Sequence, residues 1–167
     1  MPLRHRYSQP VELGVLAGLL FLTLAVGRFG AAVTQPALDT WYRDLPKPAW
    51  TPPDLAFPVV WTALYVAMAV AAWLAWRAAT HEHRRWGGAA TLFVLQLALN
   101  AAWSYLFFGL KSPPLALVDA GLLLAAVAAT IAAFARLSRA AAWLLVPYPV
   151  WVVYAVALNA AIVAKGG

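Results

Sequence analysis

The sequence has no cysteine among its 167 residues, which excludes disulfide bonds, thiolate metal sites, iron–sulfur clusters and covalently attached haem. Charged residues are also scarce, at 11% of the chain against roughly a quarter in soluble proteins. The histidines, His5, His81 and His83, lie outside the long apolar runs. What remains is 64% hydrophobic and includes nine tryptophans. These proportions predict an integral membrane protein.

Apolar runs of membrane-spanning length predict an all-α fold, an integral membrane bundle of five transmembrane helices in a single domain, 1–167. A helix rises about 1.5 Å per residue, so roughly 20 apolar residues cross a hydrocarbon core of about 30 Å. The runs that reach this length are about 13–33, 55–76, 86–110, 115–134 and 140–164. Short connections after the second run predict antiparallel neighbours. For the first run, which follows Arg4 and Arg6, a signal peptide is the alternative.

The basic residues lie at the ends of these runs rather than in one patch, so membrane topology explains the positive charge better than nucleic-acid binding does. With five spans, the N-terminal side carries Arg4, Arg6, Arg77, Arg84, Arg85, Arg136 and Arg139. The other side carries fewer: Arg43, Lys47, Lys111 and Lys165, with Arg28 close enough to the end of its span to snorkel. The positive-inside rule therefore predicts a multi-pass protein with a cytoplasmic N-terminus and loop 34–54 on the outer side.

Loop 34–54 is too rich in proline to be predicted as a helix. Each proline removes a backbone donor and favours extended geometry in the residue before it, and the loop contains Pro36, Pro46, Pro48, Pro52 and Pro53. It also carries large aromatics, Trp41, Tyr42 and Trp50. Two interpretations stay open: the aromatics anchor the loop at the headgroups, or the loop is a folded lid that lays an indole over a cavity between the helices.

Aromatic and amide side chains share narrow faces on three of the predicted helices. At about 100° per residue, spacings of three and four place residues on one stripe. The stripes are Gln96, Asn100, Trp103 and Phe107; Tyr148, Trp151, Ala155 and Asn159; and Trp61, Tyr65 and Met68. Facing aromatic walls with a few amides suit a flat, hydrophobic, conjugated ligand. The alternative is that the amides are hydrogen-bond glue between helices and the aromatics are packing.

A few polar and proline positions stand apart from these stripes. Asp119 is the one acid inside a predicted span, and we expect it to pair with Lys111 or Arg43 at the membrane surface, with a proton-relay or ligand role as the alternative. His81 and His83 indicate a solvated turn rather than a metal site, and we predict no metal site elsewhere. Pro147 and Pro149 are expected to kink the fifth helix or to shape its start.

Several strings resemble those of the translocator protein family, also called tryptophan-rich sensory proteins or peripheral-type benzodiazepine receptors. In chain order they are WYRDLPKPAWTPP, FPVVWTALYVAM, QLALNAAWSYLFFG, LALVDAG and VPYPVWVVYAVALN, and they extend over about 27–159. The resemblance, to a bacterial-type member, implies a five-helix membrane protein, usually a homodimer, with a pocket closed by the first loop. It also implies porphyrins, sterols and synthetic isoquinolines or benzodiazepines as ligands, and a link to tetrapyrrole metabolism and stress responses.

Matched motif by motif, the resemblance implies a lid tryptophan and a set of pocket residues. The lid tryptophan would be Trp50, and the pocket residues would be Trp61, Tyr65, Asn100, Trp103, Phe107 and Trp151. Tyr148 and Asn159, on the fifth-helix stripe, complete our candidate ligand-binding set. Some members are reported to degrade protoporphyrin in light, and Trp50 and Trp151 would be the catalytic pair if that occurs here.

The fifth helix departs from the animal members of the family at their cholesterol motif. That motif continues past Leu-Asn with aromatic and basic residues, whereas Leu158 and Asn159 are followed here by Ala160, Ala161 and Ile162. The tyrosine that the motif requires is missing. The motif is therefore incomplete and does not support cholesterol recognition.

The function that these features predict is a membrane receptor or sensor that binds porphyrins and related flat hydrophobic molecules in an intrahelical pocket. Porphyrin or haem would be a ligand and not a cofactor, and binding would rest on the ring because no histidine lies in a span to ligate the iron. The spans hold no hydrolytic or acid–base constellation, so an enzyme of that kind is not expected. One alternative is therefore a light-dependent porphyrin-degrading enzyme. A tetrapyrrole or sterol transporter is the other. Small residues Ala98 and Ala102 suggest the face used by a homodimer.

Overall fold

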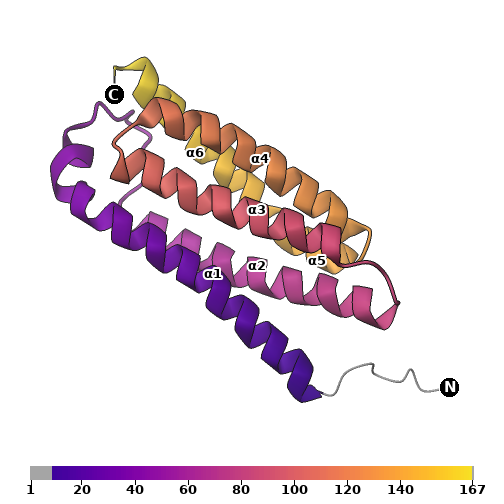
Figure 1. The fold of residues 1–167 in the computed structure, drawn as a ribbon. Helices are drawn as coiled ribbons and strands as arrows, with labels where there is room; N and C mark the ends of the chain where they lie inside the picture. The colour runs from indigo at the N-terminus through magenta and orange to yellow at the C-terminus, as the bar shows by residue number, and fades with distance from the viewer. Residues whose placement is uncertain (1–8, 167) are drawn as a thin grey trace.

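The computed structural model describes residues 9–166, and every regular element in that range is a helix (Figure 1). Five helical stretches are long and apolar enough to cross a membrane: Gln9–Tyr42, Ala56–His81, Gly87–Gly109, Pro113–Ala135 and Arg139–Ala164. The predicted all-α architecture with five spans is thereby confirmed. Arg4, Arg6 and His5, which entered the predictions above, lie outside the described residues.

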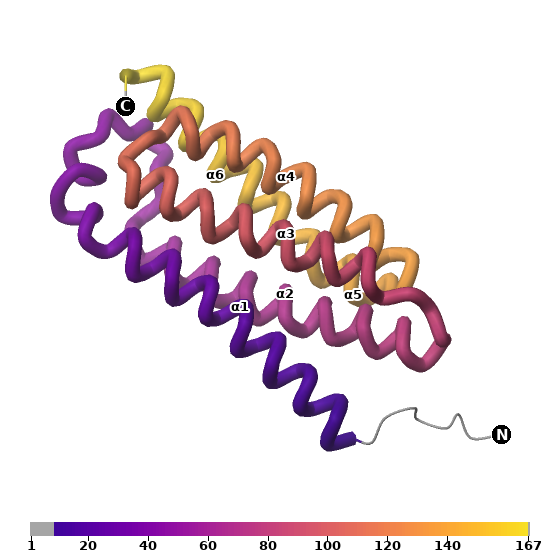
Figure 2. Tube along the Cα trace, in the orientation of Figure 1, coloured from indigo at the N-terminus to yellow at the C-terminus, as the bar shows by residue number. Residues whose placement is uncertain are grey.

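The helices are α1 (Gln9–Ala37), α2 (Ala56–His81), α3 (Gly87–Ser104), α4 (Pro113–Ala135), α5 (Arg139–Leu145) and α6 (Pro147–Ala164). Wider π-helical turns continue the first and third spans, η1 (Leu38–Tyr42) after α1 and η2 (Tyr105–Gly109) after α3. The tube in Figure 2 shows the start of α1 and the α2–α3 connection at one end of the bundle. The α1–α2 connection and the C-terminus lie at the other end. Successive spans are therefore antiparallel.

The first span is longer than predicted, and the connecting loop is correspondingly shorter. The expectation that no helix passes Pro36 was wrong, because α1 runs through this proline to Ala37, and helical turns extend to Asp44 on the far side of a non-helical kink at Thr40. A proline in the last turn of a helix removes only one backbone donor. The Thr40 hydroxyl donates to the Pro36 carbonyl at 3.1 Å, where the backbone is kinked. The connecting loop without regular helix is thus residues 45–55, which hold the remaining prolines of the segment.

The fifth span is interrupted between α5 and α6 at Val146, directly before Pro147. Since proline has no N–H, it cannot continue the backbone ladder of α5. Pro147 and Pro149 instead occupy the first turn of α6, where proline is tolerated. The expected effect of these prolines on the span is confirmed. α5 packs on α2 and α4, whereas α6 packs on α4.

The half of the bundle near the α2–α3 connection is solid. Alanines of α2 (Ala71, Ala72 and Ala75) are completely buried, so neighbouring helices approach closely. Phe93 of α3 stacks on Phe134 of α4 with ring centres 6.0 Å apart. These contacts pack the helices of this half closely against one another.

Candidate functional site

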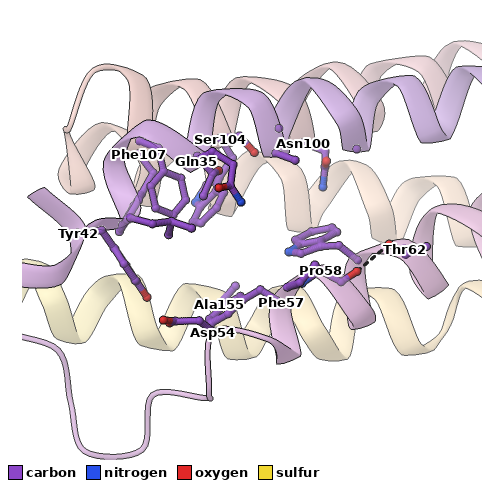
Figure 3. A pocket seen from close by; sticks show the side chains of 18 of the residues that line it. Gln35, Tyr42, Asp54, Phe57, Pro58, Thr62, Asn100, Ser104, Phe107 and Ala155 are labelled. Atoms are coloured by element: carbon purple, nitrogen blue, oxygen red, sulfur yellow. Dashed lines mark hydrogen bonds between the residues drawn. The ribbon is translucent and has the colours of Figure 1, made fainter. Parts of the chain in front are cut away.

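A cavity of about 600 Å³ lies in the half of the bundle near the connecting loop (Figure 3). Its walls come from α1 with η1, the end of the connecting loop, α2, α3 with η2, and α6. The volume falls within the range of about 300–1,000 Å³ typical of small-molecule sites. The aromatic side chains of the wall are Tyr42, Phe57, Trp61, Tyr65, Trp103, Phe107, Phe108 and Trp151. Its polar side chains are Arg28, Thr34, Gln35, Asp54, Thr62, Asn100, Ser104 and Asn159.

Most of the predicted binding residues lie on this wall. They are Trp61, Tyr65, Asn100, Trp103, Phe107, Trp151 and Asn159. Trp50 and Tyr148 are not among the lining residues. The structure thus brings the predicted stripes of α2, α3 and α6 to one cavity, while the part that each residue plays in binding stays a prediction.

Asn100 ties three helices together behind the cavity wall. The Tyr65 hydroxyl of α2 donates to Asn100 Oδ1, and Asn100 Nδ2 donates to the Tyr148 hydroxyl of α6 at 3.1 Å. Tyr148 is buried behind the wall and edges onto Trp61 with ring centres 6.1 Å apart. An amide has two N–H donors, so Asn100 keeps one beyond this chain. Tyr148 therefore supports the wall from behind, and Asn100 combines interhelical bonding with a place on the wall.

Trp50 packs against Tyr154 of α6 and is not among the residues that line the cavity. Its side chain is 48% exposed, and its backbone carbonyl accepts a hydrogen bond from the Tyr154 hydroxyl at 2.7 Å. The Trp50 and Tyr154 rings meet edge to face at 5.6 Å, and Tyr154 stacks on Trp151 at 5.6 Å. Tyr154 was missed by the sequence analysis, although it follows Trp151 by one helical turn. Its ring contacts both members of the predicted pair, Trp50 and Trp151.

Aromatic residues cluster at the end of the cavity beside η1 and η2. Trp103 stacks on Phe107 with ring centres 5.1 Å apart, and Trp41 meets Phe107 edge to face at 5.6 Å. Tyr42 is buried and packs against Phe108 at 5.4 Å. The ammonium group of Lys47 lies 4.4 Å from the centre of the Tyr42 ring. Tyr42 is therefore part of the bundle and not an anchor at the lipid headgroups.

The Leu158–Asn159 pair of α6 faces the protein interior. Both residues are buried and line the cavity. With its nitrogen turned toward the Pro113 carbonyl, the Asn159 amide donates to that carbonyl at 3.0 Å and accepts from the Leu117 N–H at 3.1 Å. The amide thus fastens α6 to the first turns of α4, as the glue interpretation requires.

The predicted pairing of Asp119 is wrong. Asp119 is buried, its Oδ2 atom has no hydrogen-bond partner, and no ion pair among residues 9–166 includes it. The reason is its helical face: Asp119 shares the inward stripe of α4 with Ala116, Ala120 and Leu123. Lys111 is exposed at the end of the bundle.

His81 does not lie in a solvated turn. It is the last residue of α2, and its Nε2 lies 3.0 Å from Glu12 Oε1 of α1. Arg77 Nε lies 2.9 Å from the other oxygen of the same carboxylate, and the Trp73 indole donates to the Glu12 carbonyl at 3.0 Å. The prediction failed because α1 begins earlier and α2 ends later than the apolar runs suggested. Within the described part of the chain, no three His, Asp or Glu residues gather as a metal site would require.

Similarity to known proteins extends over most of the chain. The sequence profile of the TspO/MBR family matches residues 19–164. The chain is 43% identical to the Tryptophan-rich protein TspO of Chlorobaculum tepidum, over 86% of this chain and 90% of that protein. It is 41% identical to the Tryptophan-rich sensory protein of Cereibacter sphaeroides, over 84% of this chain and 87% of that protein. It is 40% identical to the human Translocator protein, over 71% of this chain and 70% of that protein.

Proposed function

The chain belongs to the TspO/MBR family of multi-pass integral membrane proteins, and we propose that it is a receptor that binds porphyrins in the cavity described above. The names of the relatives, sensory protein and translocator protein, support a membrane sensor or receptor role. The observation that carries the porphyrin proposal is the composition of the wall. Flat aromatic faces from α2, α3 and α6 surround one space, and the amide of Asn100 is one of the polar groups between them.

The proposed binding rests on the porphyrin ring rather than on a metal. Trp61 and Tyr65 stack at 5.6 Å, as do Trp103 and Phe107 at 5.1 Å, so two layered aromatic surfaces face the cavity. The two histidines of the described residues, His81 and His83, are not among the lining residues. Metal-free protoporphyrin should therefore bind about as well as haem, and a strong preference for the iron form would contradict the proposal.

The test is a titration of the purified protein in detergent with protoporphyrin, followed by quenching of tryptophan fluorescence. Wild type should quench saturably. Trp151→Phe removes an indole from the wall and should weaken binding roughly fivefold, equivalent to about 1 kcal/mol of aromatic contact. Trp143→Phe is the matched control, because Trp143 is 73% exposed on α5 and does not line the cavity. Absence of saturable quenching in wild type would refute the proposal.

Light-dependent degradation of bound porphyrin is a second candidate function, favoured by the contact chain Trp151, Tyr154 and Trp50. These oxidisable rings lead from the cavity wall to the exposed Trp50. Under illumination with dioxygen as the oxidant, the pigment spectrum should decay in wild type. In Trp50→Phe the decay should slow while binding is kept, because Trp50 lies off the wall. Equal decay in wild type and this variant would exclude a role for the contacting rings Trp151, Tyr154 and Trp50 in the degradation.

A further inference from the structure

Arg28 places a cationic side chain on the cavity wall at membrane depth. It lies on α1 inside the apolar stretch from Leu13 to Val33 and is one of the lining residues. Among the described residues it belongs to no ion pair, and it donates no hydrogen bond to another described residue. An intramembrane arginine normally pairs or faces a polar space, because an unpaired charge in hydrocarbon is costly. Arg28 is exposed, and the cavity is the polar space that its side chain borders.

The position of Arg28 on α1 follows from its glycine neighbours. A Cβ added to Gly27 would lie 2.6 Å from Tyr65, and one added to Gly30 would lie 3.1 Å from the Ser104 hydroxyl, so these glycines mark the contact with α2 and α3. Arg28 is rotated by about 100° from Gly27. It shares a stripe with other lining residues of α1: Leu24, Ala31 and Gln35. Arg28 thus lies at the boundary between the cavity-lining face of α1 and the lipid-facing side of the same helix.

The charges of the cavity are separated along the bundle. Asp54, the acidic lining residue, precedes α2, whereas Gly27 and therefore Arg28 are level with Tyr65. From the start of α2 to Tyr65 the helix rises about 14 Å. Figure 3 shows Asp54 beside the Tyr42 hydroxyl at the loop end of the cavity. Lys47 lies beside the Tyr42 ring at that end but does not line the cavity, whereas Arg28 is the one cationic residue among the described lining residues. An acidic ligand group inside the cavity would therefore be attracted to the level of Arg28.

We propose that Arg28 determines the specificity of the cavity by binding a carboxylate of the ligand. A guanidinium presents paired N–H donors that match a carboxylate, and the resulting charge-assisted hydrogen bonds are stronger than neutral ones. This inference rests on the proposed function, since it gives the bound porphyrin an orientation. The ring lies on the aromatic walls, and its acid side chains point toward α1 and away from the connecting loop.

The experiment compares protoporphyrin, a dicarboxylic acid, with its dimethyl ester, which has the same ring and no charge. Both are titrated against wild type, Arg28→Gln and Arg28→Lys in an uncharged maltoside detergent, with tryptophan quenching as the readout. Wild type should bind the acid at least about tenfold more tightly than the ester. Arg28→Gln should lose this preference while keeping the affinity for the ester, which also shows that the variant is folded. Arg28→Lys should keep part of the preference for the acid over the ester.

The control is Arg136→Gln, because Arg136 is an exposed arginine at the far end of α4 and does not line the cavity. This variant should bind both compounds as wild type does. Equal binding of acid and ester by wild type would overturn the role of Arg28 and leave porphyrin binding intact. Equal weakening of both compounds in Arg28→Gln would likewise overturn it. Loss of the preference on adding phosphatidylglycerol would assign Arg28 to a lipid phosphate instead. If neither compound binds wild type, the proposed function fails as well.

Discussion

Replacing Gly27 by alanine would add a methyl group where Tyr65 already lies. The new Cβ would be 2.6 Å from Tyr65 Cε2 and 2.7 Å from Cδ2, well inside van der Waals contact. The ring cannot move freely, because the Tyr65 hydroxyl is bonded to Asn100 and the ring stacks on Trp61. Overpacking of this kind costs about 1–3 kcal/mol. A Tyr65 hydroxyl pulled away from Asn100 would add a similar cost for the unpaired buried group.

The comparison is with Gly18→Ala on the same helix, where nothing lies within 4 Å of the added Cβ. Both substitutions gain about 1 kcal/mol of helix propensity, so this contribution cancels. Gly27→Ala should therefore be less stable than Gly18→Ala by at least about 1–3 kcal/mol. It should also bind porphyrin more weakly, since Tyr65 lines the cavity. Thermal unfolding in detergent, followed by the near-ultraviolet circular dichroism of the tryptophans, measures the difference.

The same two alanine variants can also be compared in a Tyr65→Leu background, which tests whether Tyr65 causes the loss of stability. With Tyr65→Leu, the ring that would collide with the new methyl group is gone, so Gly27→Ala should cost no more than Gly18→Ala does. Equal stability of the two alanine variants in the wild-type background would refute the close approach of α1 to Tyr65. An undiminished cost in the Tyr65→Leu background would do the same.

The remaining predictions concern other parts of the bundle. Glu12→Gln should lower the unfolding free energy by about 1–2 kcal/mol, a value reduced because Arg77 is 38% exposed, whereas Glu82→Gln should change it by less than about 0.5 kcal/mol; denaturant titration compares the two. Asp119→Asn should stay within about 1 kcal/mol of wild type in the same titration, and a loss of 3–5 kcal/mol would reveal an ionic partner of Asp119. Ala98→Cys, in a chain without other cysteines, should form a disulfide-linked dimer under oxidation. An exclusively monomeric band would contradict the use of this face of α3.

The limits of sequence reasoning are clearest at Trp50 and His81. The resemblance predicted Trp50 as a lid over the pocket, yet its place depends on Tyr154, whose hydroxyl holds the Trp50 carbonyl from 104 residues away in sequence. His81 was assigned to a turn because apolar runs do not reveal how far helices continue beyond the membrane core. Its partner, Glu12, lies 69 residues away on another helix. Contacts at such separations leave no local pattern in a single sequence.

The sequence by itself determined the architecture and the composition of the cavity wall. In lipid every backbone group must be bonded within its own segment, so long apolar runs have to be helices, and their stripes show which faces avoid the lipid. Helical periodicity therefore brought Trp61, Asn100 and Trp151 to the same interior. Only the tertiary structure decided where that interior is hollow, that Tyr148 stands behind the wall, and that Arg28 faces the cavity. These outcomes depend on how far each helix extends and how closely two helices approach. Those distances are set by pairs of residues, such as Gly27 with Tyr65, on different helices.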